Sequence, residues 1–393
     1  MSGTTKYDVI IAGAGPAGTT AGYLLSNSGL RVLIIDKNTV PGKKLCGGLI
    51  THKTVKLLER VFGETVADLN RKDIINFESR RYEVFCKNKL IHQRDLDIPF
   101  RFIDRDSYDN YLLDNAQKAG TEFMGGDGVR SLDVLKSTVT TKSGQTFAAD
   151  IIIGADGVNS RIRRSFPVEL FGRNDWRGNL AAAHEIFLPR QVLKKQIDHP
   201  VLFFDFIDSG YAWIFPNRER LRVGMFALNR NNRKDILEAF RNFLSSVDLD
   251  SPEKEKIFSY VLPYGSYLPS PVFRNIILIG DAAGFADPFL GEGIFYAQRS
   301  AELASQAIVR ARQENSIVEQ AHQRIANHYV QLLNQYIYPE LRYAGKIRNF
   351  IFTFFKRFQY LPFKVLLSIF GNRPIETVHG LRSYKWMKKQ PEV

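Results

Sequence analysis

The 393-residue sequence predicts an α/β fold, in which a nucleotide-binding domain on a parallel sheet holds an inserted antiparallel sheet and is followed by a helical region. Three observations lead to this prediction. The chain opens with a strand–turn–helix–strand pattern around a glycine-rich turn. Two later apolar runs end in Gly/Asp turns, as strands do at the ligand-binding edge of an open α/β sheet. Between those runs, short stretches alternate between apolar and polar residues, as half-buried strands do.

The opening pattern indicates one βαβ unit. Residues 7–11 form an apolar run rich in β-branched side chains, and residues 31–36 form a second. Residues 16–28 between them suit a helix, for which Gly29 supplies the stop signal. Because a helix joins the two strands, we expect them to be parallel.

Two further strands of this sheet are expected at residues 150–157 and 275–281. The segment between them contains strand-like stretches at 201–206 and 221–228, which predict the inserted antiparallel sheet. We therefore expect a discontinuous Rossmann-type domain, a substrate-binding sheet domain and a C-terminal helical region. Their predicted boundaries are 1–75, 100–165 and 273–330 for the first, 76–99 and 166–272 for the second, and 331–393 for the third.

The glycine-rich turn has the spacing of a dinucleotide-binding fingerprint, Gly13-x-Gly15-x-x-Gly18. Gly13 permits the tight turn, Gly15 lets the backbone approach a pyrophosphate, and Gly18 lets helix and strand pack closely. The helix N-terminus offers free N–H groups and partial positive charge to that pyrophosphate. Asp36, which ends the second strand, can accept a hydrogen bond from a ribose 2′-hydroxyl. The pattern predicts a dinucleotide site and does not separate FAD from NAD.

Composition excludes several classes of protein. A hydrophobic share of 44% with 24% charged residues excludes general disorder. Two cysteines exclude a disulfide scaffold or multi-cysteine metal cluster, and the seven histidines show no metal-ligand spacing. A total of 54 Lys and Arg against 41 Asp and Glu leaves a net charge of +13. That excess favours an acidic partner, which is a nucleic acid, an anionic membrane or a phosphorylated ligand.

The sequence predicts neither a membrane span nor an export signal. The charge-free stretch 9–30 is interrupted by glycines, and the uncharged stretch 257–273 by prolines. The first stretch also lacks the basic flank and cleavage site of a signal peptide. Since two unpaired cysteines suit a reducing compartment, we expect a cytoplasmic protein.

One late segment carries a family resemblance. Residues 280–294 read Gly-Asp-Ala-Ala-Gly-Phe-Ala-Asp-Pro-Phe-Leu-Gly-Glu-Gly-Ile and resemble the second FAD motif of flavoproteins with the aromatic-hydroxylase type of fold. The resemblance implies that Asp281 binds the ribityl chain. It also implies that Gly291, Gly293 and Ile294 lie at the isoalloxazine ring, where a helix start can stabilise negative charge on reduced flavin.

Two shorter segments resemble other FAD contacts of the same fold. Residues 154–161, which include Asp156, resemble its central motif. Residues 103–109 resemble the stretch whose arginine contacts FAD, and that arginine is Arg105 here. Together with the segment at 280–294, they place three motifs in family order along the chain.

Two more segments resemble the geranylgeranyl reductase family, so that the resemblance covers residues 5–330. Lys44-x-Cys46-Gly47-Gly48 matches a segment that passes close to the flavin, and the Tyr-Ala-Trp-Ile-Phe-Pro of 211–216 matches the motif that lines the substrate cavity. The resemblance implies an FAD-dependent oxidoreductase that reduces C=C bonds of a prenyl (geranylgeranyl-type) lipid by hydride transfer from reduced flavin. The expected cofactor-binding residues are Gly13, Gly15, Pro16, Ala17, Gly18, Asp36, Lys37, Cys46, Gly47, Gly48, Arg105, Val129, Asp156, Asp281, Gly291, Gly293 and Ile294.

The aromatic motif also has a direct physical interpretation. Tyr211, Trp213 and Phe215 alternate along a strand, so all three should face one side of the sheet. A wall of three aromatic rings suits a long apolar substrate. The alternative is that the three rings belong to the core.

Cys46 has two interpretations. It is either a reactive cysteine that tunes the flavin or moves a proton, with Lys43 and Lys44 favouring its thiolate, or a small residue whose backbone contacts FAD. Cys86 has no motif around it, and we expect it to be structural. Alkene reduction also needs a proton, and the sequence shows no acid for that step beyond Cys46 or an ordered water.

Residues 335–393 hold 11 Lys and Arg against 3 acids, which accounts for +8 of the net charge. Within them, residues 347–370 interleave phenylalanines with basic side chains. Such helices either lie on the inner face of an anionic membrane or cap the substrate domain with a solvated basic face. No nucleic-acid recognition motif is present, so nucleic acid is not an expected partner.

The electron donor and the reaction class have alternatives. No second nucleotide-binding domain is visible, so electrons are expected from transiently bound NAD(P)H or from a reduced ferredoxin, whose acidic surface suits the basic chain. An FAD-dependent monooxygenase or halogenase of the same fold is the alternative enzyme, and a protein that holds FAD structurally at a membrane is the non-enzymatic one. Halogenases carry Trp-x-Trp-x-Ile-Pro where this chain has Tyr211 and Phe215, which favours the reductase.

Overall fold

The computed structural model forms two compact units, each made from three segments of the chain. The first comprises residues 1–43, 106–176 and 265–341, and the second comprises residues 44–105, 177–264 and 342–393. The structure describes residues 5–39, 44–171, 176–192, 196–229, 235–247, 249, 255–314, 318–358 and 361–389. Lys43, one of the two lysines expected beside Cys46, lies outside these residues.

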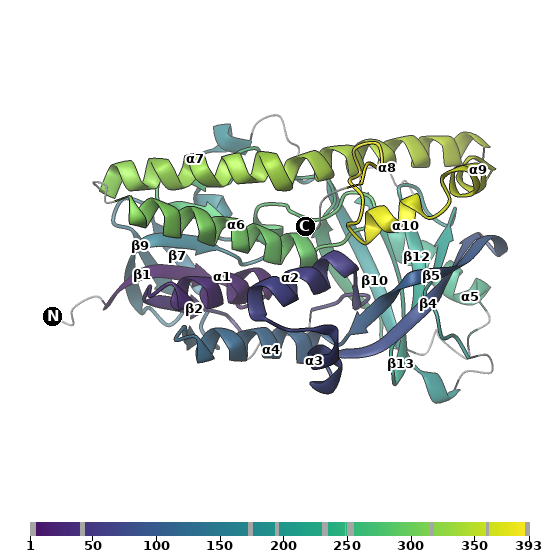
Figure 1. Cartoon of the computed structure of the whole chain (residues 1–393), viewed down its shortest axis with the longest axis horizontal. Coiled ribbons are helices and arrows are strands. Elements are labelled where there is room, and N and C mark those ends of the chain that lie inside the picture. The colour runs from purple at the N-terminus through teal and green to yellow at the C-terminus, as the bar shows by residue number, and fades with distance from the viewer. Residues whose placement is uncertain are drawn as a thin grey trace. The chain divides into compact units, whose positions relative to one another are not determined.

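The first unit is built on the expected parallel sheet, of which Figure 1 labels β1, β2 and β9. Its strand order is β15-β16-β9-β1-β2-β6. β15 is antiparallel to β16, and the other neighbours along this order are parallel. A β7–β8 ribbon continues the sheet from β9. The strands are β1 (Thr5–Ala12), β2 (Val32–Ile35), β6 (Glu122–Met124), β7 (Val129–Asp133), β8 (Thr138–Thr141), β9 (Thr146–Gly154), β15 (Val272–Phe273) and β16 (Ile276–Leu278).

The sheet of the first unit is buried on both faces, as a parallel sheet requires. Ile10, Ile34 and Ile152 on three neighbouring strands are fully shielded from solvent. The helices that contribute to this unit are α1 (Pro16–Asn27), α4 (Arg105–Lys118), α6 (Ile294–Gln313), α7 (Val318–Tyr336) and the beginning of α8 (Tyr338–Phe358). The strand–helix–strand prediction is confirmed, because β1, α1 and β2 follow one another and the two strands pair in parallel. Helix α1 ends within one residue of the expected position.

A polar contact ties three of these helices together inside the unit. Tyr108 Oη on α4 donates a hydrogen bond of 2.7 Å to Gln298 Oε1 on α6. The Gln298 amide in turn donates to Thr20 Oγ1 on α1, 3.3 Å away. All three side chains are fully buried, so the network satisfies polar groups that would otherwise destabilise the core.

The second unit contains an eight-stranded sheet with the order β14-β10-β13-β12-β11-β4-β5-β3. Its strands pair antiparallel except for β11 and β4, which are parallel. The expected inserted sheet is therefore present, with one parallel pair that the sequence did not indicate. The strands are β3 (Leu49–Ile50), β4 (Ile75–Cys86), β5 (Lys89–Ile103), β10 (Leu180–Pro189), β11 (Val201–Phe204), β12 (Gly210–Pro216), β13 (Arg220–Leu228) and β14 (Phe258–Pro263).

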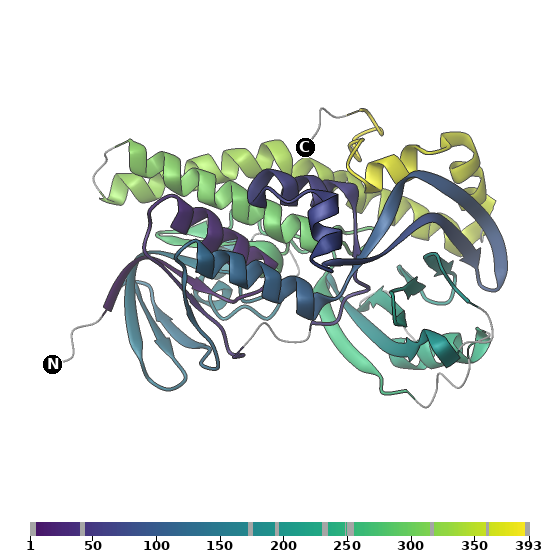
Figure 2. The same ribbon diagram turned by 60° about the horizontal axis from the view of Figure 1, so that its bottom comes forward.

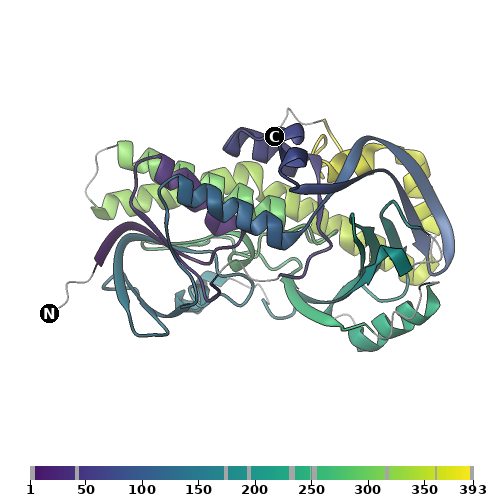
Figure 3. The same cartoon turned by 90° about the horizontal axis from the view of Figure 1, so that it is seen from below.

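The two faces of this sheet have different covers, as Figures 2 and 3 show. Helix α5 (Ile236–Ser246) lies on one face, where Phe240 and Phe243 pack into a core with Ile186, Val223 and Ile214. The other face carries the β12 aromatic side chains, and Phe352 of α8 packs against Phe204 of β11 on that side, with ring centroids 6.4 Å apart. The remaining helices of the unit are α2 (His52–Phe62), α3 (Val66–Arg71), α9 (Leu361–Phe370) and α10 (Arg373–Val378).

The observed units divide the chain differently from the predicted domain boundaries. Residues 44–75, expected with the nucleotide-binding domain, belong to the second unit because β3 and β4 both pair with β5. Residues 342–393, expected as a separate region, also belong to the second unit. Their helices include α9, which packs on β5. Among the described residues, no helix is long and apolar enough to cross a bilayer.

Candidate active site

The glycine turn of the first unit has the geometry expected of a cofactor cradle. Gly13 has a φ of +108°, and a Cβ built there would lie 2.4 Å from the Ala155 carbonyl oxygen. A Cβ on Gly18 would lie 1.9 Å from the Gly13 carbonyl oxygen. A Cβ on Gly15, by contrast, would meet no atom within 4 Å. The fold therefore requires glycine at positions 13 and 18, whereas Gly15 lines open space.

Asp36 is fixed beside this turn by the backbone. Its Oδ2 accepts a hydrogen bond of 2.8 Å from the Ala14 N–H, and its Oδ1 accepts one of 2.8 Å from the Asn38 N–H. Each carboxylate oxygen keeps a free lone pair for a further donor. The next residue, Lys37, packs against Gly128, which directly precedes Val129 at the start of β7. The structure thus brings three predicted residues, Asp36, Lys37 and Val129, to one end of the parallel sheet.

Asp156 lies on the other side of the same turn, since its Cα is 3.0 Å from the Cβ position of Gly13. Its Oδ2 accepts hydrogen bonds from the backbone N–H groups of Arg161 (2.6 Å) and Ile162 (3.3 Å). Its Oδ1 is buried without a hydrogen-bond partner among the described residues. Burial is the main cause of the raised pKa of this carboxyl. An orphaned buried oxygen beside a glycine turn fits a site that a polar ligand completes.

The segment around residues 280–294 forms a compact turn that leads into α6. Gly293 is the residue before this helix and Ile294 is its first residue. A Cβ on Gly293 would lie 3.5 Å from Asp281 Oδ1, so the predicted ribityl-binding carboxylate lies at the start of the helix. Asp287 holds the intervening turn by accepting hydrogen bonds from Phe289 N (2.7 Å) and Leu290 N (2.8 Å).

Of the other predicted residues, Gly291 has a φ of +74°, a conformation that favours glycine. Pro16 and Ala17 are buried in the first turn of α1, where proline suits the helix start. Arg105 is the first residue of α4 and is buried. The residues of the first unit fit FAD, because open space at Gly15 suits the pyrophosphate and the fixed Asp36 suits the adenosine ribose.

Comparison with known proteins agrees with this geometry. A family model described as an FAD binding domain matches residues 6–324. An uncharacterized protein of Methanosarcina barkeri is 31% identical over 331 residues, which cover 82% of this chain and 80% of that protein. The geranylgeranyl diphosphate reductase of Rhodobacter capsulatus is 28% identical and covers 77% of this chain and 75% of its own length.

Solved structures share the fold. A geranylgeranyl bacteriochlorophyll reductase-like protein from Thermoplasma acidophilum superimposes with a TM-score of 0.73, at 20% identity and over 88% of each chain. A halogenase and an oxygenase also match, with TM-scores of 0.66 and 0.63. The chain carries an FAD-binding domain and belongs to the geranylgeranyl reductase family of FAD-dependent oxidoreductases.

The second unit carries the aromatic motif on β12, and the structure confirms that its three rings share one face. The ring centroids of Tyr211 and Trp213 are 6.1 Å apart, and those of Trp213 and Phe215 are 6.0 Å apart. Phe226 on the neighbouring strand joins them, with its centroid 4.7 Å from that of Tyr211. All four side chains are buried. Together they form a continuous apolar wall on the sheet face opposite α5.

Gly224 makes room for the central ring of this wall. It pairs with Trp213 across β12 and β13, so that the two residues face the same way. A Cβ on Gly224 would lie 2.2 Å from Trp213 Cζ2. The indole therefore lies across the position of the missing side chain, toward the next strand, β10.

The predicted Cys46-Gly47-Gly48 segment packs on this same wall. A Cβ on Gly47 would lie 2.7 Å from Phe215 Cδ2 and 3.4 Å from Trp213 Nε1. Gly48 has a φ of +74°, and its N–H lies 3.4 Å from Cys46 Sγ. Two motifs that are more than 160 positions apart in sequence thus meet inside one unit.

Arg222 ties the cysteine segment to the sheet. Its Nη1 donates a hydrogen bond of 2.6 Å to the Cys46 carbonyl oxygen. Its Nη2 forms an ion pair with Asp104, whose other oxygen accepts a hydrogen bond of 2.6 Å from Asn76 Nδ2. The arginine side chain is buried, and this charged network therefore positions the Cys46 backbone with little freedom.

Among the described residues of this face, Glu185 is a strongly perturbed acid that the sequence analysis missed. It lies on β10 opposite Gly224, in the same cross-strand row as Trp213. Neither carboxylate oxygen has a hydrogen bond of ordinary geometry within the described part of the chain, and neither has the Trp213 indole nitrogen. Burial raises the pKa of Glu185 to about 7, although the Arg222 charge, the Trp213 N–H and the Cys46 backbone each act to lower it.

No signal in the linear sequence separates Glu185 from other acids. It follows His184 in a strand whose other residues are apolar, and only the register with β12 and β13 shows that it faces the aromatic wall. The two cysteines differ in exposure. Cys86 is buried, which raises its pKa to about 11, whereas Cys46 is partly exposed. Among the described residues, no cluster of His, Cys, Asp or Glu is arranged to hold a metal ion.

Proposed function

We propose that this protein reduces C=C bonds of a geranylgeranyl-type prenyl chain, using electrons that reach FAD from NAD(P)H or a reduced ferredoxin. The observation that carries the proposal is the aromatic wall of β12 with the Cys46 segment packed on it. A continuous wall of buried aromatic rings suits a long hydrocarbon far better than a polar substrate. The name of the Rhodobacter capsulatus relative supports the same substrate class.

The first unit would hold the cofactor and the second the chain. Gly13, Gly15 and Gly18 would cradle the pyrophosphate, Asp36 the ribose, and Asp281 the ribityl chain. Bound, reduced FAD supplies a hydride. The protein's own contribution is to orient the prenyl chain on Tyr211 and its neighbouring rings and to exclude water from it.

Glu185 is the residue of this face best suited to supply the proton that alkene reduction consumes. One alkene carbon gains a hydride and the other gains a proton, so each reduced bond needs one acid. A carboxyl whose pKa is about 7 holds a proton near neutral pH and can release it. The carboxylate left behind would be stabilised by Arg222 and by the Trp213 N–H, and solvent would return the proton.

The decisive experiment is anaerobic. The reduced holoprotein is mixed with a geranylgeranyl lipid, the flavin spectrum is followed, and the lipid is analysed by mass spectrometry. Re-oxidation of flavin with gain of two hydrogens per reduced bond supports the proposal, and the fully saturated lipid is the matched control. An unchanged spectrum with the unsaturated lipid would contradict it.

The same assay tests Glu185. Glu185→Gln keeps the shape but cannot release a proton, so alkene reduction should slow by about 10²–10⁴-fold with KM and flavin content little changed. The carboxyl C=O stretch in the infrared difference spectrum should disappear in this variant. An unaltered rate and pH profile would remove Glu185 from the mechanism.

A monooxygenase or halogenase is the alternative, since such enzymes share the fold. The motif at residues 211–216 favours the reductase because it has Tyr211 and Phe215 where the halogenase motif has Trp and Ile. Substrate-stimulated oxygen uptake with an oxygenated or halogenated product would support the alternative instead.

A further inference from the structure

The outer side of α8 carries a ladder of aromatic rings that the second unit does not cover. Phe350, Phe354 and Phe358 follow one another at intervals of four residues. The ring centroids are 4.4 Å apart in the first pair and 5.8 Å apart in the second. Phe350 is 53% exposed and Phe358 is 51% exposed. Such a row of exposed rings on one helix face marks an interaction surface.

The ladder continues toward the beginning of the helix. Tyr343 and Lys346 precede Phe350 by seven and four positions, so they lie on the same helix face. The Lys346 ammonium lies 5.1 Å from the Tyr343 ring centroid. Trp386, from the segment after α10, is 78% exposed and packs edge-on against Tyr343 with centroids 6.4 Å apart. Six residues form what we call the α8 outer stripe: Tyr343, Lys346, Phe350, Phe354, Phe358 and Trp386.

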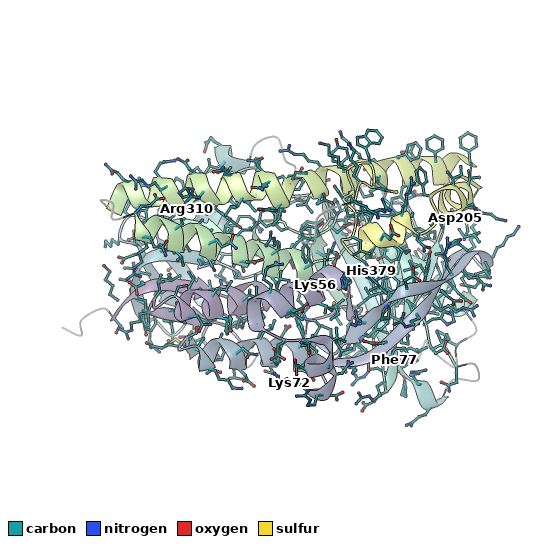
Figure 4. The ribbon with its side chains drawn as sticks, viewed as in Figure 1. Lys56, Lys72, Phe77, Asp205, Arg310 and His379 are labelled. Atoms are coloured by element: carbon teal, nitrogen blue, oxygen red, sulfur yellow. The ribbon has the colours of Figure 1, made fainter. Side chains whose placement is uncertain are left out.

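The opposite side of α8 is fixed to the sheet, and this sets the direction in which the stripe points. Ala344, Ile351 and Phe352 are buried on that side. Arg348 donates a hydrogen bond to the Tyr264 carbonyl oxygen, and its guanidinium lies 4.9 Å from the Tyr264 ring centroid. The buried Arg348 contact therefore holds the inner side of α8 and leaves the rings on the outer side. Figure 4 shows ring side chains projecting from the α8 ribbon.

The surroundings of the stripe are apolar and basic. On α9, Val365, Ile369 and Phe370 are exposed by 45%, 71% and 37%. Exposed basic residues on the same elements or next to Trp386 are Arg342, Lys346, Lys364, Lys385, Lys388 and Lys389. Glu376 is the only acid in residues 342–389 of the sequence, and it is paired with Arg382.

We propose that the α8 outer stripe docks the protein on the surface of an anionic lipid bilayer. Phe, Trp and Tyr rings flanked by lysines are the composition of helices that lie in the headgroup region, where rings enter the acyl boundary and ammonium groups meet lipid phosphates. An acidic protein partner would match the lysines but leaves the exposed phenylalanine ladder without a function. The inference rests on these contacts and not on the proposed reaction.

The test is flotation of the holoprotein with phosphatidylcholine vesicles that contain or lack phosphatidylglycerol. We expect binding only to the anionic vesicles, and its loss in high salt. The triple variant Phe350→Ser, Phe358→Ser and Trp386→Ser should bind more than tenfold more weakly. Leu135→Ser with Val168→Ser is the matched control, because Leu135 and Val168 are 79% and 77% exposed but lie in the first unit. This control should bind like the unmodified protein.

A second variant separates charge from ring insertion. Lys385→Glu, Lys388→Glu and Lys389→Glu should abolish the preference for phosphatidylglycerol. The thermal unfolding midpoint and the flavin content of each variant are measured to check that it is folded. Absence of flotation with anionic vesicles would overturn the proposal. So would full binding by the ring variant with loss in the lysine variant, since binding would then depend on charge alone, without insertion of the rings.

Discussion

Asp36 in the first unit and Glu185 in the second are both acids at a candidate site, and their surroundings differ. Both oxygens of Asp36 accept backbone hydrogen bonds of 2.8 Å, one from the Ala14 N–H and one from the Asn38 N–H. Both oxygens of Glu185 are buried without such a bond among the residues described. The backbone thus fixes the Asp36 carboxylate in the cofactor cradle before any ligand arrives. The aromatic face instead buries an acid near the Arg222 charge without a hydrogen bond of ordinary geometry, and functional sites often hold such perturbed acids.

The largest expected effect tests whether Arg222 stabilises the region around Glu185 and Cys46. Arg222→Met leaves the Cys46 carbonyl without its donor and removes the cation paired with Asp104, so the free energy of unfolding should fall by about 3–4 kcal/mol in urea denaturation. The same change removes a nearby positive charge, which should raise the pKa of Glu185 above about 7. Arg220→Met, on the same strand but exposed, is the control and should change stability little. Equal losses in both variants would contradict the proposed network.

The next effect follows from the pKa of Glu185. The folded pKa of about 7 exceeds the ordinary value of 4.5, so the folded protein binds the proton more tightly than the unfolded chain. Stability should therefore be greatest below pH 4.5 for this group and fall by about 3 kcal/mol as the pH rises to 7. Urea unfolding of Glu185→Gln should lack this decline, whereas Glu238→Gln, an exposed acid on α5, should retain it. A decline that persists in Glu185→Gln would assign it to another group.

A smaller effect on stability, but a sharp one on the cofactor, is expected at Gly15. The Cβ that Gly15→Ala adds would meet no atom within 4 Å, so the free energy of unfolding of the cofactor-free protein should change by less than about 0.5 kcal/mol. The added methyl group would occupy the space assigned to the pyrophosphate, and the affinity for FAD measured by calorimetry should fall. Gly18→Ala is the contrast, because its methyl group would meet the Gly13 carbonyl oxygen and destabilise the fold itself. Normal FAD binding by Gly15→Ala would contradict the assignment of the pyrophosphate site to this turn.

The smallest expected effect is a difference in reactivity between the two cysteines, and its test needs no substitution. The raised pKa of Cys86, about 11, leaves very little thiolate near neutral pH, and its side chain is buried. Iodoacetamide followed by peptide mass spectrometry should therefore label Cys46 in the folded protein and leave Cys86 unlabelled until urea is added. Labelling of Cys86 at the same rate as Cys46 would contradict the structural role we assign to it.

The sequence was informative wherever a local pattern carries the physics. The spacing of Gly13, Gly15 and Gly18 predicted a turn in which two of them have no room for a side chain. Alternation along residues 211–216 predicted that Tyr211, Trp213 and Phe215 share a face, which the ring distances confirm. The site residues themselves stay predictions, because their roles depend on bound groups.

What only the tertiary structure decided depends on contacts between distant segments. The sequence by itself determined the strand–turn–helix fingerprint, the aromatic alternation and the basic C-terminal region, because each of these is set by neighbours along the chain. Strand register decided that Glu185 lies in one row with Gly224 and Trp213. Burial of Ala344, Ile351 and Phe352 together with the Arg348 contact decided which side of α8 is turned outward. Register and helix rotation are settled by burial against the rest of the chain, and no local pattern contains that information.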